Sequence, residues 1–294
     1  MAVKAVGILS PGDMGSAVGQ VLHEHGLGVV TCLEGRSQLS HLRAKEAGFR
    51  TVPSLDDLVR QVDVLLSILV PAEAVKLAER VAERLRAAGA RLVYADFNAI
   101  APQTTKQIGT IIEAAGSQFV DGGIIGNPPR SGAKTRFYCS GPDVSAVMEL
   151  GQFGLDVRTL GDVIGHASGL KMVYAASTKG TTALWTELLT AAKVMGLSDA
   201  LACELAESRV YAPIKAGIPT MPRRSRRWVG EMEEIAKTFD NLGLTPKMLL
   251  GAADMYRLVG RTPLGARSER DPNPSFEETI ETVVKELMEG QPHP

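Results

Sequence analysis

The chain has 294 residues, more than the roughly 100 to 200 residues of a usual single domain, so its length favours two domains. Hydrophobic residues make up 45% and charged residues 22%, which is typical of a globular protein with a sizeable core. The 32 basic and 33 acidic side chains give a net charge of −1. No overall positive field therefore favours binding to nucleic acid or to an anionic membrane.

Cysteine spacing and hydropathy set the expected compartment. Cys32, Cys139 and Cys203 lie far apart, without Cys-x-x-Cys or Cys/His spacing, which argues for a reducing compartment and against a zinc site. No stretch approaches the roughly 18 apolar residues of a membrane span, and the N-terminal residues lack the apolar core of a signal peptide. We expect a cytoplasmic protein without a bound metal.

The first half of the chain alternates short apolar runs with longer amphipathic segments, which is typical of βαβ units and a mainly parallel, doubly wound sheet. The predicted strands are Val3–Leu9, Val29–Leu33, Val64–Leu69, Arg91–Ala95 and Gln118–Gly122, with Phe137–Ser140 and Asp156–Thr159 as further candidates. The predicted helices between them are Ser16–His25, Ala72–Ala87 and Pro102–Ala115.

Strand patterns stop after Gly161, where the second half begins. Residues Ile164–Met195 contain no proline and place apolar residues at near-helical intervals, which predicts one long helix. Further helices are predicted at Ser198–Tyr211, Ser225–Leu242, Pro246–Val259 and Phe276–Met288. We predict a sheet domain over residues 1–161 and an all-helical domain over residues 162–294.

A glycine-containing turn follows the first strand and opens the first helix. Its residues are Ser10, Gly12, Asp13, Met14 and Gly15, with Pro11 between the first two. At such a turn the backbone can approach a pyrophosphate, while the N–H groups and dipole of the helix face the phosphates. The turn predicts a Rossmann-type dinucleotide site, although Ser10 stands where G-x-G-x-x-G has its first glycine.

The second strand ends at the distance from the glycine turn where an adenosine ribose is normally bound. Glu34 could accept a hydrogen bond from a ribose 2′-hydroxyl, whereas Arg36 and Ser37 could bind a 2′-phosphate. We favour NADP over NAD because Arg36 offers a guanidinium and Ser37 a hydroxyl to a 2′-phosphate. NAD remains the alternative, because the carboxylate of Glu34 would repel that phosphate.

Residues that follow two later predicted strands are also expected to contact the cofactor. Val70 and Pro71 follow the strand Val64–Leu69, and Asn98 follows Arg91–Ala95. Because ligands of doubly wound sheets bind at the carboxyl ends of the strands, these residues are cofactor candidates. Asn98 has the alternative role of a helix cap.

The sequence resembles the β-hydroxyacid dehydrogenases, which include 3-hydroxyisobutyrate dehydrogenases and are related to 6-phosphogluconate dehydrogenase. The resemblance covers nearly the whole chain and implies a Rossmann-type domain followed by a helical substrate and dimerisation domain. It rests on residues 10–15 for G-x-G-x-M-G, Val70-Pro71, residues 96–102 for D-x-S-T-x-x-P, residues 121–127 for D-A-P-V-S-G-G, and residues 165–171 for G-x-G-x-x-x-K.

The last motif implies that Lys171 is the catalytic residue. Small residues before it let a helix approach a nicotinamide and substrate closely, and helical spacing places Tyr174 and Thr178 on the same face as Lys171. Partial desolvation on such a face lowers the pKa of a lysine, so that it can exchange a proton with a hydroxyl or carbonyl oxygen.

Departures from the family pattern concern the substrate. The resemblance implies a substrate role for Ile125 and Gly126, yet Ile125 replaces the serine that binds the substrate carboxylate. Tyr174 stands close to where an asparagine is usual, and its hydroxyl could supply a hydrogen bond instead. Arg223–Arg227 could bind an anion or form a solvated charged loop.

The sequence therefore predicts an NAD(P)-dependent oxidoreductase that interconverts a small hydroxy compound, such as a β-hydroxy acid, and its carbonyl, with Lys171 as acid/base. One alternative is an imine reductase of the same fold, although such enzymes usually lack the lysine. Another is a non-catalytic nucleotide sensor. The resemblance and the long helix, which needs partners on more than one face, also predict a homodimer.

Overall fold

The computed structural model describes residues 2–130, 133–268 and 271–289. The chain forms two compact units, Met1–Met172 and Val173–Pro294. The first unit holds the sheet and the second is helical, as expected. No helix in the described part of the chain is long and apolar enough to span a membrane.

The sheet unit is built on eight strands in the order β3-β2-β1-β4-β5-β6-β7-β8. All neighbours are parallel except β6 and β7. The order reverses between β1 and β4, which is the switch point where doubly wound folds bind ligands. The strands are β1 (Ala5–Ile8), β2 (Gly28–Cys32), β3 (Arg50–Val52), β4 (Val64–Ser67), β5 (Val93–Asp96), β6 (Gln118–Ile125), β7 (Arg136–Ser140) and β8 (Asp156–Thr159).

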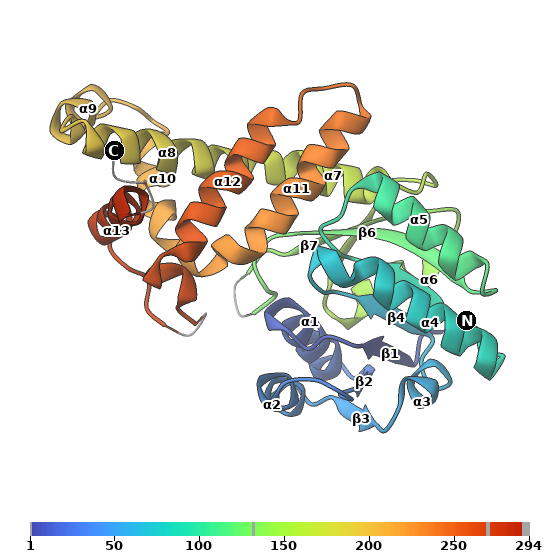
Figure 1. Ribbon diagram of the computed structural model, residues 1–294. Helices are drawn as coiled ribbons and strands as arrows, with labels where there is room; N and C mark the ends of the chain where they lie inside the picture. Colours follow the sequence, from blue (N-terminus) through green and yellow to red (C-terminus); the bar gives the residue numbers. More distant parts are fainter. Residues whose placement is uncertain (1, 131–132, 269–270, 290–294) are drawn as a thin grey trace. The chain divides into compact units, whose positions relative to one another are not determined.

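Helices cover both faces of this sheet (Figure 1). On one face lie α1 (Asp13–Glu24), α2 (Gln38–Glu46) and α6 (Ser145–Glu149); on the other lie α3 (Leu55–Val59), α4 (Ala74–Ala88) and α5 (Pro102–Glu113). Successive strand residues face opposite sides, so Val64 and Leu66 enter the first core while Leu65 enters the second. Strands buried on both faces read as continuous apolar runs, which is why they were recognisable in the sequence.

All seven predicted strands are confirmed, but four short strands and α-helices of the sheet unit were not predicted. These are β3, α2, α3 and α6. The strand β3 has only three residues, and α2 buries only Ala44, so neither carries the apolar periodicity on which the prediction depended.

The long helix predicted over Ile164–Met195 is present with an irregularity inside it. It runs as α7 (His166–Ala175), the π-helical segment η3 (Ala176–Gly180) and α8 (Thr181–Val194). The unit boundary falls after Met172, inside α7, rather than after residue 161 as predicted. The hydrogen bonds that tie the start of α7 to β6, described below, account for the difference.

The helical unit continues with α9 (Ser198–Glu204), α10 (Tyr211–Gly217), α11 (Ser225–Asn241), α12 (Lys247–Arg261) and α13 (Phe276–Glu289). The last three confirm their predictions. The single helix predicted over Ser198–Tyr211 is wrong, because α9 ends at Glu204. This helix buries none of its residues, so little packing energy is available to extend it.

A buried ion pair holds the π-helical segment within the helical unit. Lys179 Nζ pairs with Glu231 of α11 and lies 5.5 Å from the ring centroid of Trp228. Tyr256 of α12 donates a hydrogen bond of 2.6 Å to the Lys179 carbonyl oxygen. Because Lys179 and Glu231 are both largely buried, separating them would leave an uncompensated charge in the core.

Candidate active site

The glycine turn joins β1 to α1 and leaves open space beside it. A Cβ on Gly12 would meet nothing within 4 Å, whereas one on Gly15 would lie 2.3 Å from the Ser10 carbonyl oxygen. Gly15 thus permits the close packing of helix on strand that the sequence predicted. Ser10 replaces the expected glycine without strain, because no described non-glycine residue has a positive φ.

Asp13, the first residue of α1, faces a cation from a distant loop. Arg130 Nη2 lies 2.6 Å from Asp13 Oδ1, at a point where the N–H groups of the first helical turn favour anions. Arg130 balances the carboxylate beside the expected pyrophosphate position. Sequence reasoning missed it because the two residues are 117 positions apart. Met14 is partly buried and packs against the core on the face of the sheet that α1 covers.

A cavity of about 330 Å³ lies at the carboxyl ends of β1 and β2. Glu34, Gly35 and Arg36 line it, together with Arg80 from α4, which the sequence analysis did not identify. Ser37 is not among the lining residues. Its Oγ accepts a hydrogen bond of 3.3 Å from the Ser40 backbone N–H and caps α2.

The ends of β4 and β5 are joined through Asn98. Its Nδ2 donates to Ser67 Oγ at 2.8 Å and to Asp96 Oδ2 at 2.9 Å, and its Oδ1 accepts from the Leu69 backbone N–H at 2.6 Å. The side chain is buried and fully used within the sheet unit, so it positions the strand ends; the cap of α5 is Ala101. Burial raises the pKa of the Asp96 carboxyl to about 7.

The same edge of the sheet presents apolar surface after β4. Val70 is 47% exposed, and Pro71 begins a short 3₁₀ turn (Pro71–Glu73) that leads into α4. Both residues stand after the end of β4, at the switch point, which is the location expected for residues that pack against a cofactor.

The start of α7 is anchored by Asp121 of β6, a fully buried carboxylate. It accepts hydrogen bonds from the backbone N–H groups of Gly165 at 2.8 Å, Ala167 at 3.0 Å and Ser168 at 3.1 Å. Ser140 Oγ donates a further bond of 2.9 Å. Burial raises the pKa of the Asp121 carboxyl, while these donors oppose the shift. Asp121 thus caps α7 and fixes it to the sheet.

Gly123 lets α7 lie directly on β6. A Cβ there would be 2.7 Å from the Ala167 carbonyl oxygen and 3.1 Å from Lys171 Cβ. Lys171 is half-buried above the carboxyl-terminal part of β6. The structure therefore places Lys171 toward the same sheet edge as the glycine turn, because β1 and β6 run in the same direction.

The substrate candidates from the sequence are divided between the two units. Ile125 is buried at the end of β6, and Gly126 follows it with a φ of +135°, a conformation that favours glycine. Tyr174 is 42% exposed in the helical unit. Thr178 lies in the π-helical segment, across which the regular spacing that predicted a common face with Lys171 does not hold.

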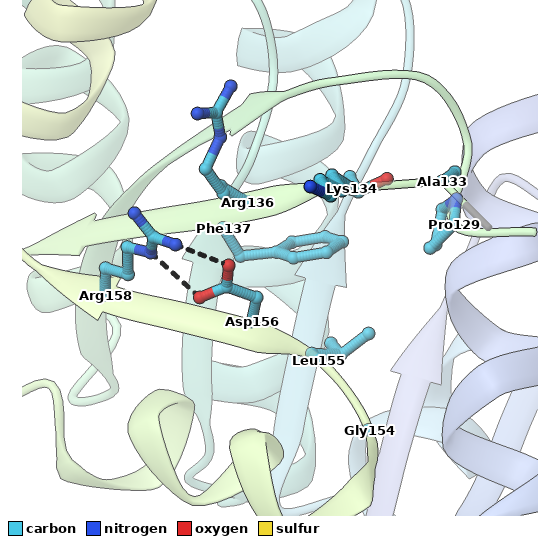
Figure 2. A pocket seen from close by; sticks show the side chains of 10 residues that line it. Pro129, Ala133, Lys134, Arg136, Phe137, Gly154, Leu155, Asp156 and Arg158 are labelled. Atoms are coloured by element: carbon cyan, nitrogen blue, oxygen red, sulfur yellow. Dashed lines mark hydrogen bonds and ion pairs between the residues drawn. The ribbon is translucent and has the colours of Figure 1, made fainter.

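A second cavity, of about 260 Å³, lies where β7 and β8 begin (Figure 2). Lys134, Arg136 and Arg158 line it with one carboxylate, Asp156. Arg158 binds both oxygens of Asp156, through Nε at 2.8 Å and Nη2 at 2.7 Å. These basic residues are spread over β7, β8 and the loop before β7, so no local pattern in the sequence marks them as one group.

The arginine cluster Arg223–Arg227 makes contacts within the helical unit. Arg226 Nε donates to the Gly260 carbonyl oxygen at 3.0 Å, and Arg227 Nε lies 3.4 Å from Glu231 Oε1. Arg223 Nη1 donates to the Asp271 carbonyl oxygen at 2.9 Å. Among the described residues, no group of three or more His, Cys, Asp and Glu side chains could hold a metal ion.

Comparisons with known proteins match both the sheet unit and the helical unit. The NAD binding domain of 6-phosphogluconate dehydrogenase matches residues 5–148, and a domain of unknown function, DUF1932, matches residues 192–259. The chain is 28% identical over 257 residues to an uncharacterised 28.5 kDa protein from Methanothermus fervidus, covering 86% of this chain and 98% of that protein.

Solved structures share the two-part fold. A conserved protein of unknown function, described as structurally similar to 3-hydroxyacid dehydrogenases, matches with 28% identity and a TM-score of 0.66, covering 90% of this chain and 100% of the other. A 3-hydroxyisobutyrate dehydrogenase from Mycobacterium tuberculosis matches with 17% identity and a TM-score of 0.69, covering 96% and 99%. Imine reductases bound to NAD+ and to NADP+ also have this fold.

Proposed function

The chain is a divergent member of the β-hydroxyacid dehydrogenase family, and from this premise we propose that it is an NAD(P)-dependent oxidoreductase that interconverts a small hydroxy compound and its carbonyl. A β-hydroxy acid or a relative is the proposed substrate. The observation that carries the proposal is the position of Lys171 on α7. This helix packs against Gly123 of β6, and Asp121 caps its first turn.

The residues at the sheet edge fit a dinucleotide. The open side of Gly12 and the N–H groups at the start of α1 suit a pyrophosphate, and the cavity lined by Glu34 and Arg36 suits an adenosine ribose. When bound, the nicotinamide supplies or accepts the hydride. The protein contributes binding and orientation through these residues and through the apolar surface of Val70 and Pro71.

Within this function the preferred cofactor is NADP. Arg36 and Arg80 line the ribose cavity, so two guanidinium groups stand against the one carboxylate of Glu34. A 2′-phosphate carries about two negative charges and three acceptor oxygens, which arginine binds with charge-assisted hydrogen bonds. The second arginine strengthens a preference that Arg36 and Ser37 suggested.

Lys171 is the proposed acid/base. Its side chain is half-buried, and its backbone is fixed by the contact of α7 with Gly123, so its ammonium group can be held at one position. As a protonated group it donates a proton to the substrate oxygen during reduction; as a neutral amine it accepts the hydroxyl proton during oxidation.

We expect the Lys171→Ala variant to bind NADPH like the wild type and to lose about 10²- to 10⁴-fold in kcat, the usual contribution of a positioned acid/base. Cofactor fluorescence measures binding, and consumption of NADPH against a panel of small carbonyl compounds measures turnover. Lys45→Ala, at an exposed lysine of α2, is the matched control. A near-normal rate in Lys171→Ala would refute the catalytic assignment.

Reduction of a C=N bond is the second candidate. The apolar Ile125 favours it, because this residue stands where hydroxyacid dehydrogenases have a carboxylate-binding serine, and imine reductases share the fold. The presence of Lys171 favours the alcohol instead. Paired ketone and imine substrates of the same carbon skeleton, added to the same panel, distinguish the two.

A further inference from the structure

Arg136, the first residue of β7, lies opposite Ile125, the last residue of β6. Residues directly opposite each other in an antiparallel pair project from the same face of the sheet, and so do residues two apart on one strand. Gly123, which α7 contacts through Lys171 Cβ, is two residues before Ile125. Arg136 and Lys171 therefore occupy the same face of the sheet, at the same end of β6.

Hydrogen bonds from Arg158 and, to a smaller extent, the charge of Arg136 lower the pKa of the neighbouring Asp156 carboxyl. Both oxygens of Asp156 are bound by Arg158, and Figure 2 shows the Arg136 side chain directed away from that pair. Arg136 Nε is buried and has no hydrogen-bond partner within residues 2–130, 133–268 and 271–289. A buried charged donor without an acceptor costs free energy, and a ligand that supplies the acceptor recovers it.

The local charge favours an anionic ligand. Lys134 and Arg136 add two positive charges at the start of β7, while the one nearby carboxylate is already paired with Arg158. On the β6 side, Ile125 is only 3% exposed and has no hydrogen-bonding group in its side chain. The Ile125 side chain therefore offers an anion no donor, whereas Arg136, opposite it on β7, offers a guanidinium.

We propose that Arg136 is a specificity-determining residue that binds the carboxylate of the substrate on the face of β6 that carries Lys171. This inference rests on the proposed function and narrows its substrate class to anionic hydroxy and carbonyl compounds. A guanidinium presents two parallel N–H donors to a carboxylate, so it also fixes the orientation of the substrate.

The test compares short 3-hydroxy acids with their methyl esters as substrates for oxidation by NADP+. In Arg136→Met, kcat/KM for the acids should fall on the order of 100-fold, equivalent to about 2.7 kcal/mol, while the value for the esters should change less than about threefold. Arg136→Lys should recover part of the loss. Arg60→Met, at an exposed arginine after α3, is the control and should not discriminate between acid and ester.

Equal losses on acids and esters in Arg136→Met would overturn the proposal. So would a weaker affinity for NADP+ in that variant, or a wild type that oxidises both compounds without preferring the acids. Calorimetric titration of 3-hydroxypropanoate into the NADP+-loaded protein separates this proposal from the proposed function, because it needs no turnover. Binding that is lost in Arg136→Met supports Arg136 even where the wild type oxidises neither compound. Absence of binding to the wild type overturns it.

Discussion

At the scale of single residues, the cavity at the end of β2 brings opposite charges together. Glu34 and Arg36 flank Gly35, whose φ of +69° marks a tight turn, and Arg80 reaches the same cavity from α4. In the sequence, Glu34 favours NAD and Arg36 favours NADP, so these two residues alone do not decide between the cofactors. Only folding adds Arg80, because it stands far from β2 in the chain and lines this cavity from a helix on one face of the sheet.

We predict that Arg36→Ala raises the Kd for NADPH by about 10- to 100-fold and changes the Kd for NADH less than threefold, because a charge-assisted hydrogen bond to the 2′-phosphate is lost. Fluorescence titration of both cofactors measures the ratio. Arg60→Ala, at an exposed arginine after α3, is the control. An unchanged ratio in Arg36→Ala would contradict the NADP preference, and a weaker affinity for NADH in Glu34→Gln would support NAD instead.

At the scale of elements, the contact of α7 with β6 sets the position of Lys171. Asp121 supplies the acceptors for the first N–H groups of α7, and Gly123 removes the side chain that would separate helix from strand. The sequence motifs contained both residues, but their roles depend on a contact between segments about 45 residues apart, which spacing along the chain does not show.

Gly123→Ala should therefore lower kcat by about 10- to 100-fold with little change in NADPH affinity. The added Cβ would displace α7, and a shift on the order of 1 Å at a catalytic group has such an effect on rate. Steady-state kinetics and cofactor titration measure the two quantities.

Gly151→Ala is the matched control for this variant, since a Cβ at Gly151 would meet nothing within 4 Å and its φ is not positive. It should leave kcat unchanged. Wild-type turnover in Gly123→Ala would show that the close approach of α7 to β6 is not needed for activity.

Irregular elements were the least predictable. The π-helical segment Ala176–Gly180 carries no pattern that distinguishes it from the helix on either side, and it is stabilised by the contacts of Lys179 with Glu231 and Tyr256. The apolar periodicity predicted a regular helix, and tertiary contacts decided otherwise.

At the scale of the whole molecule, the helical unit exposes many large apolar side chains. Leu184, Met195, Leu242 and Met248 are each at least 60% exposed. Leu184 and Met248 lie on α8 and α12, and Met195 and Leu242 directly follow α8 and α11. Exposed apolar surface is found at interfaces between subunits. It supports the proposal, first made from the family resemblance, that the protein is a homodimer.

Multi-angle light scattering at micromolar concentration should give twice the mass of one chain. The double variant Leu184→Glu/Met248→Glu should shift toward the mass of one chain, because charges on a buried interface are costly. Leu39→Glu, at an exposed leucine of α2 in the sheet unit, should not. A wild type with the mass of a single chain would refute the homodimer.

The sequence alone determined the fold class and located the glycine turn, and its resemblance to the β-hydroxyacid dehydrogenases identified Lys171 as a candidate. The fold class and the turn depend on local information: apolar runs in strands buried on both faces, glycines at one tight turn, and helical spacing over long segments. Only the tertiary structure decided which residues from distant segments lie together. It places Arg130 beside Asp13, Arg80 in the same cavity as Arg36, Asp121 at the start of α7, and Arg136 opposite Ile125. Such contacts arise from strand order and register, which chain spacing does not encode.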